Sequence, residues 1–246
     1  MKTTISCLMM FLSCISGNAQ THAAKNFETD IFETSKGQLK ITFIGHASLL
    51  IEAGNQAIHV DPVSQEADYS SLPKADLILV THEHFDHFDK KAIAMISNPK
   101  TKIVVSKSCK GLIENGFVLL NGEQKSFGDW GIEAVPAYNL VNKRPDGRPF
   151  HSKGNGNGYV ITYGGKRIYV AGDTENIPEM ANLKDIDIAF LPMNLPYTMT
   201  PQMVADGAKS FMPAVLYPYH YGETDPQLLV DLLKDAPIKV RIRKMN

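Results

Sequence analysis

The stretch ADLILVTHEHFDH, residues 75–87, joins an apolar run to a dense group of polar side chains. The run at residues 77–80 is typical of a buried β-strand. The polar part places three histidines and one aspartate within six positions: His82, His84, Asp86 and His87. Imidazole nitrogens and carboxylate oxygens are ligands for first-row metal ions. The stretch therefore predicts a strand that ends at a metal site, and its spacing suits two adjacent ions.

The pattern His-x-His-x-Asp-His after an apolar strand resembles the signature of the metallo-β-lactamase superfamily. Its flanking segments, from about Lys40 to His220, are similar to one branch of that superfamily. This branch contains ascorbate-6-phosphate-lactonase-like hydrolases and N-acyl-phosphatidylethanolamine phospholipase D. The resemblance implies an α/β (α+β) fold, a four-layer αββα sandwich with its metals at one edge.

Residues 1–19 have the features of a signal peptide, with Lys2 before a short apolar segment and a small-residue ending at Ala19. We therefore expect an exported protein, periplasmic or secreted. Two alternatives stay open: a retained membrane helix, for which the apolar segment is short, and a lipoprotein signal ending before Cys14, which would give a lipid anchor. We expect residues 20–37 to form a polar lead-in and residues 38–246 to form the metallo-hydrolase domain.

The charged residues are balanced and interspersed, with 25 Lys and Arg against 26 Asp and Glu. No basic patch indicates nucleic acid, so we expect a small-molecule substrate. No linker or repeat divides the chain, which indicates one domain after the leader. Removal of residues 1–19 would leave Cys109 as the one thiol, so metal and core packing would stabilise the fold without a disulfide. The oligomeric state stays open.

Periodicity and turn residues predict alternating strands and helices. Thr200 and Pro201 form a helix start signal, with Thr200 as the N-cap. The glycine-rich residues 154–158 lack the Lys-Ser/Thr ending of a P-loop, and we interpret them as a flexible approach, at positive φ, to the strand at 159–163. The expected strands cover residues 39–44, 49–53, 57–61, 77–80, 102–105, 123–127, 132–137, 159–163, 167–171, 186–191, 215–219 and 238–242, and the expected helices cover 89–96, 109–114, 201–211 and 226–233.

Two residues before the central motif are candidates for the site. Asp61 ends an expected strand, and in resembling proteins an aspartate at this point supports the ligands from beneath the metals. His46 lies in a Gly-His-Ala-Ser turn that resembles a loop near the site in the same branch. His46 either contacts substrate or is bound to nearby backbone in its turn.

The third ligand of the first metal is displaced relative to the resembling proteins. They supply a histidine after a strand that corresponds to residues 133–137, but here that strand runs into Tyr138 and Asn139. The next histidine is His151, and imidazole is a better zinc ligand than a carboxamide. We therefore assign His151 as the ligand and expect Tyr138 and Asn139 to line the pocket.

The second half of the chain supplies three further candidates. Asp173 follows an apolar strand in Gly-Asp-Thr, which resembles the motif whose aspartate bridges the two ions. Its alternative role is the N-cap of a helix at residues 175–180. His220 ends the last strand expected to reach the site and resembles the final ligand of the second metal. Tyr197 lies in a segment that resembling proteins place at the pocket mouth.

The candidates, assigned by resemblance except for His151, give one ion at His82, His84 and His151, another at Asp86, His87 and His220, and Asp173 between them. Zinc suits the many histidines, while manganese and iron accept the same donors. The two ions would activate a hydroxide that cleaves an ester, lactone or phosphodiester bond, with Asp86 and Asp173 as catalytic residues. The alternative function is an exported metal-binding or scaffold protein of the same fold without turnover.

Overall fold

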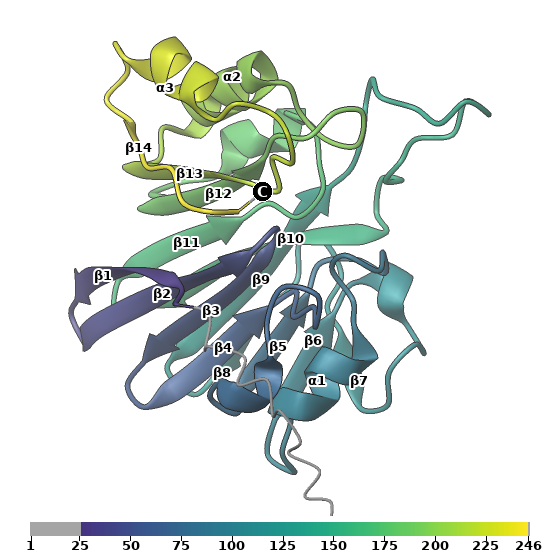
Figure 1. Cartoon of the computed structure of the whole chain (residues 1–246), viewed down its shortest axis with the longest axis vertical. Helices are drawn as coiled ribbons and strands as arrows, with labels where there is room; N and C mark the ends of the chain where they lie inside the picture. The colour runs from purple at the N-terminus through teal and green to yellow at the C-terminus, as the bar shows by residue number, and fades with distance from the viewer. Residues whose placement is uncertain (1–25, 246) are drawn as a thin grey trace, which may run out of the picture.

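The computed structural model describes residues 26–245, which form two sheets with helices on their outer faces (Figure 1). Helix α1 lies against one sheet, and α2 and α3 lie against the other. This arrangement is the αββα sandwich, so the fold prediction is confirmed. The expected signal peptide and Cys14 lie outside the described residues.

The first sheet has seven strands in sequence order, antiparallel from β1 to β4 and parallel from β4 to β7. Strands β2, β3 and β4 form an antiparallel meander. The strands are β1 (Glu28–Thr34), β2 (Gly37–Gly45), β3 (Ser48–Ala53), β4 (Gln56–Val60), β5 (Leu77–Val80), β6 (Lys102–Val105) and β7 (Gly116–Val118).

The second sheet has the same plan, with seven strands in sequence order from β8 to β14. Strands β8 to β11 are antiparallel, and β11 to β14 are parallel. The strands are β8 (Gln124–Phe127), β9 (Trp130–Ala137), β10 (Gly156–Tyr163), β11 (Lys166–Val170), β12 (Ile188–Pro192), β13 (Val215–Tyr219) and β14 (Lys239–Val240).

Strand β5 shows why the apolar run is continuous. Leu77 and Leu79 belong to the large core cluster that includes both sheets, whereas Ile78 and Val80 pack in the smaller cluster with α1. Successive side chains of a strand point to opposite faces, and both faces are covered here. The run is buried throughout, which fixes the direction in which it delivers the histidines that follow.

Three α-helices cover the sheets: α1 (Lys90–Ile96), α2 (Pro201–Phe211) and α3 (Gln227–Leu233). Thr200 caps α2, because its hydroxyl accepts a hydrogen bond from Met203 N, as the start signal predicts. Short 3₁₀ turns occupy Tyr69–Ser71, Lys107–Cys109 and Pro178–Asn182. None of the helices in the described region is long and apolar enough to cross a bilayer.

Three predictions of local structure are corrected. Part of the expected lead-in is strand β1, which pairs with β2 along its whole length, so the folded domain begins before residue 38. The expected helix at 109–114 is absent, because the only helical turn there is the 3₁₀ turn that ends at Cys109. Finally, Gly156 and Gly158 lie inside β10 without positive φ, and only Gly154 of that run has it.

Packing, not backbone conformation, explains Gly158. A Cβ there would lie 2.8 Å from Ala171 O and 3.1 Å from the Tyr169 ring.

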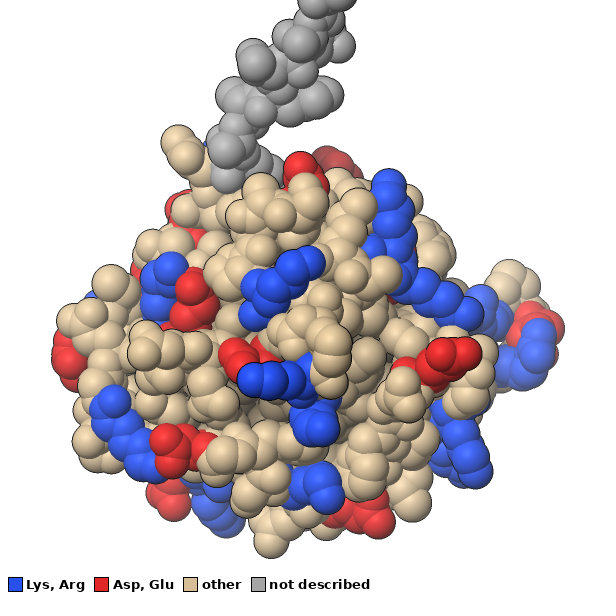
Figure 2. Space-filling model, turned by 90° about the horizontal axis from the view of Figure 1, so that it is seen from below, with Lys and Arg blue, Asp and Glu red and all other residues tan. Residues whose placement is uncertain are grey.

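On the face shown in Figure 2, Lys and Arg side chains are interspersed with Asp and Glu, as expected from the sequence.

Candidate metal centre

The polar residues gather where parallel strands of both sheets end. Asp61 follows β4, whose last residue pairs with Leu79 of β5, and His82 lies two residues after the end of β5. Asp173 follows β11 and His220 follows β13 in the facing sheet. Because parallel strands end at the same edge of a sheet, residues far apart in sequence meet at one edge of the sandwich.

A first group of donor atoms consists of His82, His84 and His151. His84 Nδ1 and His151 Nε2 lie 3.2 Å apart, and the His82 and His84 rings are 4.6 Å apart between centroids. This is the trio that sequence analysis assigned to the first ion. The polar loop at residues 140–150 folds back so that Arg144, Phe150 and His151 line the same pocket as His84.

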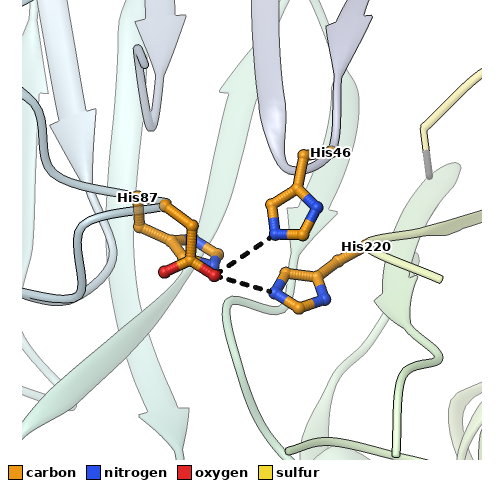
Figure 3. Close-up of side chains that lie close together, drawn as sticks. His46, His87 and His220 are labelled. Carbon is orange, nitrogen blue, oxygen red and sulfur yellow. Dashed lines mark hydrogen bonds and ion pairs between the residues drawn. The ribbon is translucent and has the colours of Figure 1, made fainter. Parts of the chain in front are cut away.

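A second group contains His46, Asp86, His87 and His220. The Nε2 atoms of His46 and His220 lie 3.3 and 3.7 Å from the same oxygen, Asp86 Oδ2. Dashed lines mark both contacts in Figure 3. The two rings lie 3.8 Å apart, and His220 N donates to His46 O. From the sequence we expected His46 either to contact substrate or to bind nearby backbone within its turn. In the structure its imidazole lies among the side chains that could bind a metal ion.

Asp173 lies between the two groups. Its carboxylate is 3.8 Å from His82, 3.3 Å from His87, and 3.4 Å from both His151 and His220. The preceding residue must be glycine, because Gly172 has φ +65° and a Cβ there would lie 2.6 Å from Asn157 O. The alternative role is excluded: only a 3₁₀ turn follows, at Pro178–Asn182, and its N-cap is Ile177, so Asp173 is not a helix N-cap.

Hydrogen-bond partners fix which nitrogen of two histidines faces the centre. His87 Nδ1 donates to Asp61, and His151 Nδ1 donates to Asn139 Oδ1, both at 2.8 Å. Each ring therefore carries its proton on Nδ1, and the lone pair of Nε2 points at the centre. An imidazole held in this way is ready to bind a cation.

The donor set fits divalent metal ions. The Nε2 atoms of His82, His87 and His220 and Asp173 Oδ1 are buried without a hydrogen-bond partner. Each such atom costs roughly 1–3 kcal/mol unless a ligand satisfies it. Two donors on one tetrahedral zinc, each at about 2.0–2.1 Å, are about 3.3–3.4 Å apart, which matches the 3.2 to 3.8 Å separations of the first group and Asp173.

Burial and neighbouring charges set the protonation of these residues. Burial lowers the pKa of His82 well below its usual value and that of His151 to about 4. Burial would raise the pKa of Asp173, but His220 and His87 hold it well below its usual range. Burial would lower the pKa of His87, but Asp173 raises it well above its usual value, so a cation that binds there must displace the proton on Nε2. At neutral pH the metal-free centre therefore offers His82 and His151 as neutral imidazoles and Asp173 as an ionised carboxylate, the forms that bind cations.

Asp61 forms hydrogen bonds with His87 and with Thr81, the residue before His82. It is fully buried, and besides His87 it accepts hydrogen bonds from Thr81 N at 2.8 Å and Thr81 Oγ1 at 2.6 Å. It therefore fixes the orientation of the His87 ring and the position of Thr81, the residue before His82.

Asn139 and Glu175 hold the loop that carries His151. Asn139 Oδ1 accepts from both the backbone N and Nδ1 of His151, so it orients this ring and does not replace it. The buried Glu175 carboxylate accepts from Asn139 Nδ2 and from the backbone N of residues 140, 141 and 142, at 2.6 to 3.2 Å. Sequence analysis missed Glu175; its position directly after Gly-Asp-Thr was the available signal.

An open pocket of about 500 Å³ lies over the centre. His46 and Tyr197 line it, as expected, and the Tyr197 ring packs edge-on against Phe150 at 5.2 Å. Tyr138 and Asn139 do not line it, which corrects both expected pocket contacts. The Tyr138 ring is buried and its hydroxyl donates to Glu179, while the Asn139 side chain binds Glu175 and His151. Arg144 and Phe85, which sequence analysis also missed, do line the pocket.

Comparison with known proteins adds an independent observation. A family model described as a β-lactamase superfamily domain matches residues 40–220. A UPF0173 metal-dependent hydrolase of Pelotomaculum thermopropionicum is 32% identical over 222 residues, which cover 82% of this chain and 96% of the relative. The chain belongs to the UPF0173 metal-dependent hydrolase family.

Solved structures agree with this UPF0173 assignment. The crystal structure of a proposed metal-dependent hydrolase from Parabacteroides distasonis is 50% identical and has a TM-score of 0.87, over 90% of this chain and 100% of that one. Igni18, a metallo hydrolase from Ignicoccus hospitalis, is 25% identical with a TM-score of 0.68, over 85% and 96% of the two chains. The superfamily and enzyme-class predictions are therefore confirmed. The narrower lactonase and phospholipase branch stays a prediction.

Proposed function

We propose that this UPF0173 protein is a hydrolase with a dinuclear metal centre that cleaves an ester, lactone or phosphodiester bond in a small molecule. The observation that carries the proposal is the position of Asp173. Its buried carboxylate lies within 3.8 Å of imidazoles from both donor groups. A carboxylate has two oxygens and can join two cations, which a single imidazole cannot do.

Each of the two donor groups would bind one metal ion. His82, His84 and His151 would hold one ion, and Asp86, His87 and His220 would hold the other. Two divalent ions bound there would lower the pKa of a water molecule and stabilise negative charge on the reacting oxygen. Asp86, one-third exposed at the pocket floor, can accept a hydrogen bond from the attacking water and orient it.

Two side chains are placed to give a proton to the leaving group. His46 Nε2 lies 3.3 Å from Asp86, and its ring also lines the pocket. The half-exposed Tyr197 reaches the same pocket from the segment before α2. Zinc is the metal that we propose, because imidazoles outnumber carboxylates; manganese and iron are tested beside it.

The proposed localisation and substrate class are supported mainly by the sequence. The leader-like residues 1–19 support an exported, periplasmic or secreted enzyme. The similarity to the lactonase and phospholipase D branch supports lactones, esters and phosphodiesters as the bonds to test. The mixed surface charge supports a small-molecule substrate over nucleic acid.

The test measures bound metal per chain and turnover on the same protein batches. Substrates are bis(4-nitrophenyl) phosphate, 4-nitrophenyl pentanoate and a panel of lactones, each with zinc, manganese or iron. We expect two metals per chain and turnover that falls by at least about 10³-fold in His82→Ala and Asp173→Asn. The control is His59→Gln, because His59 is a buried histidine outside the donor groups.

Two outcomes would contradict the proposal. One metal per chain would remove the dinuclear centre. Two metals with no turnover on any bond class, or with turnover that is insensitive to these substitutions, would favour the metal-binding scaffold.

A further inference from the structure

Arg144 occupies a distinctive position beside the centre. It lies in the loop between β9 and β10, is half-buried, and lines the same pocket as His84, Asp86 and Asp173. Among the residues that line this pocket in the described part of the chain, it is the only lysine or arginine. A permanent positive charge therefore faces the space where substrate would bind.

The Arg144 guanidinium has no carboxylate partner within 4 Å among residues 26–245, unlike every other arginine of the chain. Arg148, four residues later, pairs with Asp146 through two hydrogen bonds of 2.9 and 2.7 Å. Arg144 makes one long contact, from Nη2 to Phe150 O at 3.5 Å, and lies 5.1 Å from the Phe150 ring centroid. Most of its donors are thus free to bind a ligand.

The backbone of Arg144 is held in place. Its N donates to Arg148 O at 2.7 Å and its O accepts from Gly147 N at 2.9 Å, so residues 144–148 form a tight turn. Glu175 binds the start of the same loop, and Asn139 joins that start to His151. The loop therefore positions the base of the guanidinium relative to the metal donors, which lowers the ordering cost of binding a ligand.

The surroundings strengthen an interaction with an anion. Phe85, Phe150 and Tyr197 line the pocket beside Arg144. Apolar walls lower the local dielectric and increase the attraction between opposite charges. A guanidinium binds carboxylate and phosphate groups through two parallel hydrogen bonds.

We propose that Arg144 binds an anionic group of the substrate, a carboxylate or a phosphate, at a distance from the bond that is cleaved. This inference rests on the proposed hydrolase function and narrows its substrates to molecules with a second, negatively charged end. Arg144 determines specificity: it contacts the substrate but not the reacting atoms.

The test uses ligands that bind metal at one end and are not hydrolysed by the expected reaction. Zinc-loaded protein is titrated calorimetrically with pentanohydroxamic acid and with glutaric monohydroxamic acid, in which a carboxylate replaces the terminal methyl group. The succinic and adipic homologues vary the reach, and 4-phosphonobutanohydroxamic acid carries a phosphonate in place of the carboxylate. The variants are Arg144→Gln and the control Lys143→Gln, which removes one charge from an exposed neighbour in the same loop.

We expect the wild-type protein to bind an anionic tail about tenfold to hundredfold more tightly than the neutral tail, as for a charge-assisted bidentate pair. Arg144→Gln should abolish this preference, while Lys143→Gln should keep it and both variants should retain wild-type metal content. The stronger of the carboxylate and phosphonate tails identifies the anion. No preference in the wild type, an equal preference in Arg144→Gln, or no hydroxamate binding at all would overturn the inference.

Turnover separates this inference from the proposed function. The same proteins are assayed on 4-nitrophenyl pentanoate and on the mono-4-nitrophenyl ester of glutarate. If the anionic hydroxamates bind through Arg144 but none of the tested bond classes is cleaved, the hydrolase proposal fails and the anion site stands. If both esters are cleaved with the same kcat/KM and no hydroxamate distinguishes the variants, the anion site fails and the hydrolase stands.

Discussion

Asp61 accepts a hydrogen bond of 2.8 Å from His87 Nδ1, and both side chains are completely buried. The same carboxylate binds the backbone and hydroxyl of Thr81, immediately before His82. Asp61 also has φ +43°, an uncommon conformation for a non-glycine residue. One residue at the end of β4 therefore positions a histidine from each donor group.

Asp61→Asn is expected to weaken metal binding about tenfold to hundredfold, because the amide brings a donor against the donors of His87 or Thr81. Competition with a chromophoric chelator measures the affinity. Asp76→Asn is the matched control, since Asp76 also accepts a backbone hydrogen bond in the same sheet but lies outside the donor groups. Equal metal affinity in both variants would show that Asp61 does not support the centre.

Glu175→Gln is expected to loosen the loop of residues 140–150, since a glutamine amide group must face one of the N–H donors that the carboxylate accepts. Misplacing His151 and Arg144 should lower kcat/KM by roughly 10²-fold. Limited proteolysis should cut the loop faster than in the wild type. Glu179→Gln, the same change in a partly exposed residue that binds Lys153, should change neither readout; a loop that resists protease equally in Glu175→Gln would contradict the anchoring role.

Asp30→Asn is expected to destabilise the fold by about 3 kcal/mol, because it leaves two arginines without their carboxylate. Asp30, on β1, accepts from Arg243 at 2.6 Å and Arg241 at 3.0 Å and also from the Tyr217 hydroxyl, so it joins the first sheet to the C-terminal segment. Urea unfolding measures the change. The exposed pair of Asp129 and Lys36 supplies the control, and Asp129→Asn should change the free energy of unfolding by no more than about 1 kcal/mol.

His59 should make the metal-free protein less stable as pH falls. Burial lowers the pKa of His59 to about 4 from an ordinary 6.5, while its Nε2 donates to Pro73 O. Between these two values the unfolded chain binds a proton that the folded chain does not, so the contribution of His59 to stability falls as pH drops through this window, by up to about 3 kcal/mol. His59→Gln keeps a donor for Pro73 and should flatten this part of the curve.

Urea unfolding in the presence of a chelator, at several pH values between 6.5 and 4, tests that expectation. The donor-group histidines contribute the same background to both proteins, so the comparison isolates His59. Identical slopes in the two proteins would contradict it.

The sequence by itself determined most of the sandwich strands, the cap of α2 and the position of most metal-donor residues along the chain. Alternating apolar residues and turn signals are local properties, and a histidine directly after a buried strand has its position set by that strand. That His82, Asp173 and His220 share one edge was implied by the resemblance of their strand-end motifs to the metallo-β-lactamase superfamily. The family match then confirmed the superfamily and fold that the His-x-His-x-Asp-His pattern indicates.

Only the tertiary structure decided the pairing of β1, the burial of Tyr138 away from the pocket, and the positions of Glu175 and Arg144. Strand β1 is polar, so its place depends on its hydrogen bonds to β2 and on the contacts of Asp30 with the far end of the chain. Glu175 acts on residues more than thirty positions earlier. Contacts of this kind leave no local periodicity in the sequence, because they are set by which loops the closed sandwich brings together.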